Sequence, residues 1–233
     1  MKQLRCLVRL ITLLCLIALA PHALSADLSV SVDVVEAKLN EVKDSQDLDE
    51  TARARLTELY RKTLSHLEKI NNYKANTKTF REALQSAPAE TAAIRDKLEK
   101  TRQTDPTSEL RLSDKTPLSD IEQLLTKEKA NRTAVQAKLT GTNEQLAKES
   151  NRPAAARDRI SKAAQRREEL SSELQLAAPA NEAAEVTEAR QWMLASEDTM
   201  LEAEIRMLDQ ELLSQPVRVE LLKAKRDKDA LSL

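Results

Sequence analysis

The stretch that decides the fold is LTELYRKTLSHLEKINNYKANTKTFREAL, from Leu56 to Leu84. Spacings of three and four residues alternate along it without interruption, and six of the nine positions on this seam are large and apolar or aromatic. Such a repeat predicts a helix that packs along its length as in a coiled coil. We expect this helix to run from about Asp49 to Ser86, roughly 55 Å at 1.5 Å per residue. The seam consists of Leu56, Leu59, Thr63, His66, Ile70, Tyr73, Thr77, Phe80 and Leu84.

The composition of the 233-residue chain indicates the same fold class. Glycine occurs once, aromatic residues make up 2% of the chain, and charged residues make up 32%. β-Hairpins need glycine-containing turns and β-branched runs, and a large globular core draws on aromatic side chains. We therefore predict an all-α protein, an extended antiparallel helical bundle or coiled coil in which short breaks fold long helices back on one another.

Prolines mark most of the expected breaks. A short helix with a frayed start is predicted over Leu28–Val42, and further helical pieces are expected after Pro88 and from Pro153. Proline suits the first turn of a helix, because its missing N–H is not needed there. The final expected fragment starts at Pro216. We expect Lys223–Leu233 to fray, because no partner for its apolar face is evident in the chain.

Two other helix starts are predicted from capping residues. Ser119 with Glu122 matches a capping box, and Asn181 is a favourable N-cap for the last long helix. We accordingly divide the chain into a signal peptide (1–25), an N-terminal helical hairpin region (26–102), a linker (103–118) and a C-terminal helical coiled-coil region (119–233) whose last helix is expected to be truncated.

The helix expected after Ser119 has a mixed seam. Apolar and polar residues share one 3-4 frame, so we expect its partner surface to be irregular or partly hydrated. The apolar members are Leu118, Ile121, Leu125, Val135, Leu139 and Leu146, and the polar members are Glu128, Arg132 and Thr142.

The start of the chain has the pattern of a secretory signal peptide. Three basic residues precede LITLLCLIALA (Leu10–Ala20), and small residues after Pro21 allow cleavage following Ser25 or Ala26. The apolar run is shorter than the about 20 residues that span a bilayer. We therefore predict export to the periplasm with cleavage.

The leader limits the chemistry open to the mature chain. Both cysteines, Cys6 and Cys15, lie in it, which excludes a disulfide framework, a cysteine nucleophile and a thiolate metal site. His66 is then the single histidine, and Gly141 the single glycine. We predict no catalytic, cofactor-binding or metal-binding residues. Loss of the leader changes the net charge from −1 to −4, which gives no electrostatic reason to bind nucleic acid.

Large, soft side chains gather at one place, where Trp192 is followed by Met193, Met200 and Met207. In one interpretation they fill an irregular seam between helices. In the other they form a contact patch for another segment or another protein. Neither interpretation implies a cofactor.

The stretch EARQWMLASEDTMLEAEIRMLDQELLSQPVRVELLKAKRD (Glu188–Asp227) resembles the periplasmic helical region at the front of large bacterial mechanosensitive channels of the MscS type, the potassium efflux KefA group. The combination of AEI, LDQELLS, a proline and RVELLKAKRD carries the likeness. NRPAAARDRI (Asn151–Ile160) and DLDETARARLTELYRKTLSHLEKI (Asp47–Ile70) fit the same pattern more loosely.

This resemblance implies a non-enzymatic role in sensing membrane tension and releasing ions during osmotic downshock. In that family, membrane helices and the pore follow the periplasmic region. Nothing after Ala20 is apolar for long enough to span a bilayer, so we expect no pore in this chain and carry over no pore residue. The implied partners are copies of the chain itself or the rest of a channel subunit, with cell-envelope proteins or the cell wall as further candidates.

Other functions are weighed against this one. A stand-alone periplasmic coiled-coil adaptor or scaffold remains the main alternative, although an export adaptor should carry flanking Gly- and Val-rich β segments. A holdase-like chaperone should have a basic body with a β-rich core, which this sequence does not offer. An enzyme is the least favoured class.

The leader yields a direct prediction. Cells that express the full chain should produce a periplasmic form beginning near Ala26 or Asp27, because basic, apolar and cleavage regions follow one another in the required order. N-terminal sequencing of the purified protein checks this. A membrane-bound product that still begins with Met1 would contradict it.

Overall fold

The structure, a computed structural model, describes residues 30–103 and 116–233. Nearly all of these residues lie in helices and none lies in a strand, which confirms the all-α prediction. The expected signal peptide and most of the expected linker lie outside the described residues. The four helices are α2 (Val32–Asp44), α3 (Glu50–Gln103), α4 (Leu118–Gln175) and α5 (Ala184–Leu231).

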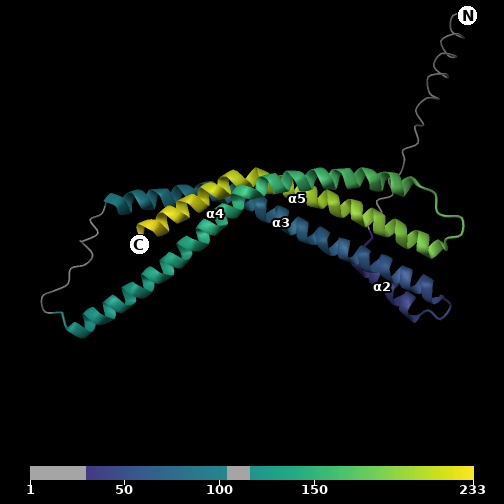
Figure 1. The fold of residues 1–233 in the computed structure, drawn as a ribbon, viewed down its shortest axis with the longest axis horizontal. Coiled ribbons are helices and arrows are strands. Elements are labelled where there is room, and N and C mark those ends of the chain that lie inside the picture. The colour runs from purple at the N-terminus through teal and green to yellow at the C-terminus, as the bar shows by residue number, and fades with distance from the viewer. Residues whose placement is uncertain (1–29, 104–115) are drawn as a thin grey trace, which may run out of the picture.

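Helix α5 is the centre of an elongated bundle (Figure 1). Both α3 and α4 pack against α5, and α2 packs against α3. Tyr60 and then Arg95 of α3 meet Trp192 and then Glu220 of α5, so these two helices run parallel. Helix α4 runs antiparallel to α5, its neighbour in the chain. The chain therefore reverses direction between successive long helices, as predicted, while α3 and α5 pack side by side in the same direction.

The predicted seam of α3 is the surface on which this helix packs. All nine of its positions are buried or half-buried. The same 3-4 spacing then continues beyond Leu84 through Ala87, Thr91, Ile94 and Leu98, again at buried or half-buried positions. One uninterrupted seam thus covers almost the whole helix.

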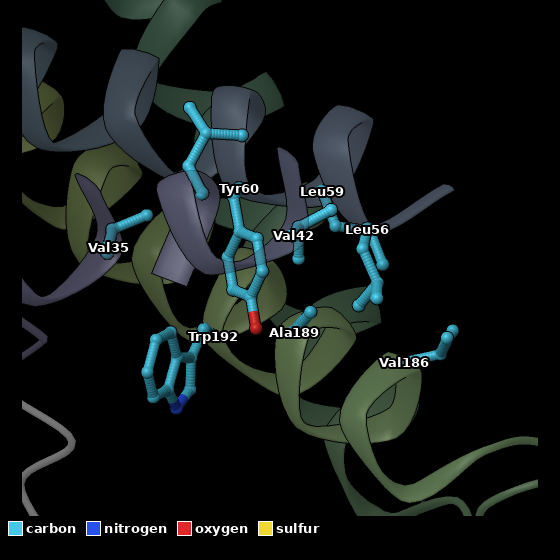
Figure 2. Close-up of a cluster of buried hydrophobic side chains, with 9 residues drawn as sticks. Val35, Val42, Leu56, Leu59, Tyr60, Val186, Ala189 and Trp192 are labelled. Carbon is cyan, nitrogen blue, oxygen red and sulfur yellow. The ribbon is translucent and has the colours of Figure 1, made fainter. Parts of the chain in front are cut away.

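One end of the bundle is closed by a cluster that joins three helices (Figure 2). The rings of Tyr60 on α3 and Trp192 on α5 lie 5.9 Å apart at a tilted angle of 56°, an arrangement that aromatic pairs favour. Val35 of α2 is fully buried beside them. The short helix α2 is thereby attached by its apolar face, as a helix of 13 residues must be to remain folded.

The predicted breaks at proline are wrong. Pro88, Pro153 and Pro216 all lie inside continuous helices. An internal proline removes one backbone hydrogen bond and costs about 3 kcal/mol. The helices continue because tertiary packing of residues near each proline offsets that cost. At Pro88, for example, the flanking seam residues Ala87 and Thr91 are both buried while the proline itself is exposed.

The expectation for the end of the chain is also corrected. The segment after Pro216 is not a separate fragment, because α5 continues to Leu231. Its partner is the second half of α3. Arg95 of α3 pairs with Glu220 at 2.6 Å, and Ala224 is only 2% exposed.

One predicted helix start is found in the structure, and two others differ from the prediction. Asp49 caps α3, since its Oδ1 accepts a hydrogen bond from the Ala52 N–H at 2.8 Å. Ser119 is not an N-cap, because Pro117 holds that position and the Ser119 hydroxyl donates to Asp120 instead. Helix α5 begins after Ala183, two residues beyond the expected cap at Asn181.

Across residues 30–103 and 116–233, the structure contains no helix with the length and apolar character needed to cross a membrane.

The continuous helix through Pro88 makes a prediction. Pro88→Ala should raise the free energy of unfolding by up to about 3 kcal/mol, because alanine restores the N–H and fits an exposed helical position. Gln85→Ala, at another exposed position of α3, is the matched control and should change stability by less than about 0.5 kcal/mol. Urea denaturation followed by circular dichroism measures both. A Pro88→Ala protein less stable than the parent would show that the proline suits the local backbone.

Candidate functional site: the ion-pair ladder between α4 and α5

Helix α5 has two packing faces that lie side by side. The first faces α3, where Trp192 meets Tyr60 and Ser196 meets His66. The second faces α4 and includes Glu197, which lies one residue further on than Ser196. Both faces repeat with alternating spacings of three and four residues. A single helix therefore supplies the common wall of two coiled-coil interfaces.

The interface with α4 is built from apolar layers one heptad apart. On α4 the three fully buried residues are seven positions apart, and on α5 three buried leucines have the same spacing. The antiparallel register places small alanines level with leucines in two layers and a leucine pair in the third. The α4 residues are Ala156, Ala163 and Leu170, and the α5 residues level with them are Leu208, Leu201 and Leu194.

Ion pairs with the same heptad spacing lie between these layers. Each consists of an arginine of α4 whose guanidinium donates two hydrogen bonds to one carboxylate of α5. The N–O distances lie between 2.5 and 3.3 Å. We call this set the ladder. Its rungs are Arg152–Glu211, Arg159–Glu204 and Arg166–Glu197.

The carboxylates of the ladder are more buried than the guanidinium groups. The side chains of Glu204 and Glu211 are 9% and 6% exposed, whereas those of Arg159 and Arg152 are 45% and 49% exposed. Hydrogen bonding to Glu204 is the main cause that raises the pKa of Arg159 above its usual value. The arginines therefore stay charged, and each buried carboxylate keeps its partner, which a buried charge requires.

The ladder fixes the axial position of α4 on α5. A shift of one residue moves one helix along the other by about 1.5 Å. This is enough to break the paired hydrogen bonds between guanidinium and carboxylate in every rung at once. Removal of a partner from a buried charge is costly. Register is thus the property that these charges control.

The ladder ends where three helices meet. Arg218 of α5 lies 4.9 Å from the ring centre of Phe80 on α3, a cation–π distance. The same guanidinium pairs with Glu149 of α4 and receives further support from Ser214, whose hydroxyl accepts a hydrogen bond at 3.2 Å. Beyond this point no described residue of α4 toward Leu118 is buried.

His66 is a packing residue of the seam between α3 and α5. The Ser196 hydroxyl donates to the Met193 carbonyl at 2.8 Å, which leaves its oxygen free to accept from His66 Nδ1 at 3.0 Å. Burial lowers the pKa of His66, so the neutral ring is favoured. No group of three or more His, Cys, Asp or Glu residues in the described segments could hold a metal ion.

The predicted patch of soft side chains lies largely inside the bundle. Trp192, Met200 and Met207 are each at most 8% exposed, and Met193 is half-buried. Each belongs to, or packs against, an apolar cluster that includes residues of other helices. These side chains therefore pack mainly against other helices of the same chain. That this patch also contacts another protein, through the exposed part of Met193, stays a prediction.

A comparison with protein families adds an identification to this geometry. Residues 38–233 match the mechanosensitive ion channel porin domain, a match that extends over far more than half of the chain. The chain belongs to this family. The porin domain is associated with ion channels and is not an enzyme family, so the role of this chain is related to mechanosensitive channels. No curated protein and no solved structure matches the chain.

The ladder of this porin domain was not predicted from the sequence. Its signal is present, because Arg152, Arg159 and Arg166 have the same seven-residue spacing as three glutamates of α5. Charges seven residues apart do not touch within one helix, because only residues three or four apart are neighbours on a helix surface. Only the antiparallel register brings the two sets together.

The buried rungs predict unequal effects of similar substitutions. Glu204→Gln should lower the free energy of unfolding by about 1–2 kcal/mol, because it replaces hydrogen bonds between charged groups and Arg159 is partly exposed to water. The control Glu202→Gln alters a more exposed carboxylate of the same helix and should change stability by less than about 0.5 kcal/mol. Chemical denaturation measures the difference. Equal effects at both positions would show that the ladder contributes no more than a surface pair.

Proposed function

We propose that this chain is the periplasmic, non-enzymatic helical extension of an MscS-type channel of the potassium efflux KefA group, and that it serves ion release during osmotic downshock. The family match over residues 38–233 carries the proposal. The predicted signal peptide supports a periplasmic position, and the likeness of Glu188–Asp227 to the KefA group supports the narrower assignment.

The geometry is suited to a mechanical part. Helices α3 and α4 contain 54 and 58 residues, which corresponds to about 80–90 Å at 1.5 Å per residue. The ladder and the two seams of α5 oppose sliding between neighbouring helices. A displacement at one end of such a bundle would be passed to the other end with little loss, as an extension above a tension-gated pore requires.

The partners we propose follow from this role. The chain is joined to, or assembles with, the rest of a channel subunit, and it associates with copies of itself. In a full-length relative it would be tethered to the inner membrane. Cell-envelope proteins or the cell wall are further contacts that such an extension would reach.

Cell fractionation and electrophysiology test this proposal in the organism that carries the gene. An antibody against α5 should detect the chain in the inner-membrane fraction. An in-frame deletion of codons 38–233 should change the pressure threshold of a mechanosensitive conductance in patches from spheroplasts. A periplasmic protein free of the membrane, with an unchanged conductance after the deletion, would instead favour a stand-alone coiled-coil adaptor or scaffold.

A further inference from the structure

The first half of α4 projects from the bundle (Figure 1). We call residues 118–148 the α4 arm. None of its residues is buried, and Leu118 and Leu125 are 71% and 52% exposed. A single helix of this kind gains most of its stability from packing its apolar face. The arm therefore presents a surface that another helix would stabilise.

The second half of α5 is a poor partner for this surface. If the register of the ladder continued, Gln145 of the arm would lie level with Arg218, and Lys138 would lie level with Lys225. In this register the alternation of arginine with glutamate ends at Arg152–Glu211, and the next two positions would offer no ion pair and then a repulsion between like charges. Arg218 pairs instead with Glu149, which lies outside this register. Helix α4 leaves α5 at the point where this charge pattern changes.

The seam of the arm has a two-fold pattern in its sequence. Taken outward from residue 130, the seam positions on the two sides lie at equal distances of two, five and nine residues. The inner pair has opposite charges, and the two outer pairs are apolar. From one end to the other these residues are Ile121, Leu125, Glu128, Arg132, Val135 and Leu139.

We propose that the α4 arm pairs with the α4 arm of a second copy of this chain, antiparallel and centred on residue 130. In that register, Glu128 of each copy faces Arg132 of the other, and Leu125 faces Val135. Ile121 then faces Leu139 of the other copy. Every layer of the pair is either apolar on both sides or oppositely charged, as a specific coiled-coil contact requires.

The charges also select against the parallel arrangement. In a parallel pair in register, Glu128 would face Glu128 and Arg132 would face Arg132, both in the centre of the seam. Like charges placed together at such positions suppress the wrong pairing. The antiparallel pair has one repulsion, between the two copies of Lys129 at the outer edge, where solvent and salt screen it.

Self-association is part of the function proposed above, and the arm contact rests on that part and not on the channel assignment. A contact with two-fold symmetry joins two chains through identical surfaces. The arm contact would therefore join these extensions in pairs, independently of the contacts that the rest of each chain makes.

Cysteine cross-linking tests the position of the two-fold axis. In the full chain with Cys6→Ala and Cys15→Ala, no other cysteine is present. Asn131→Cys lies next to the axis and should give a covalent dimer with a short bismaleimide. Gln145→Cys occupies the same heptad position two heptads further along α4, far from the two-fold axis. This variant should stay monomeric. Equal dimer yields at both positions, or no dimer at Asn131→Cys, would overturn the proposal.

Charge exchange provides a second readout. Glu128→Arg alone and Arg132→Glu alone should each raise the dissociation constant of the dimer about tenfold, which corresponds to about 1.4 kcal/mol. The double variant should restore the parent value, because each exchanged residue again faces its opposite. Sedimentation measures association, and circular dichroism confirms that the variants remain helical. Double exchange without recovery would rule out the Glu128–Arg132 contact.

Discussion

Helix α5 holds the bundle together because it packs on two sides at once. Its two faces are offset by one residue, so Ser196 belongs to the interface with α3 and Glu197 to the interface with α4. No contact between the backbones of α3 and α4 is found among the described helices. Their relation to each other is therefore set mainly through α5, with side chains such as Tyr73 of α3 and Ile160 of α4 meeting in the shared clusters. A change that turned α5 about its axis would disturb both interfaces together.

The two interfaces of α5 differ in what makes them specific. The interface with α3 combines apolar packing with an aromatic pair and a histidine–serine hydrogen bond, and it tolerates prolines in both helices. The interface with α4 alternates apolar layers with ion pairs. Removal of water from the carboxylates of Glu204 and Glu211 is costly and is compensated only in one register. The ladder therefore contributes selectivity of alignment more than net stability.

The same chemistry explains both the joined and the separated parts of α4. One 3-4 frame runs through the helix from Ile121 to Leu174, yet only its second half is covered by α5. The division coincides with the point where the glutamates of α5 give way to a basic segment that begins at Arg218. Family membership places this helix in a mechanosensitive channel context. There, a bound half and a projecting half would serve different contacts.

The sequence by itself determined the fold class and the seam of α3, because these depend on composition and on spacings within one helix. It did not determine that Pro88, Pro153 and Pro216 stay inside helices, since the compensation comes from packing against a different helix. The sequence also could not place Trp192 and the methionines in the interior, nor pair Arg159 with Glu204. Those outcomes depend on register between helices, and register is a property of two surfaces in contact that only the tertiary structure decides.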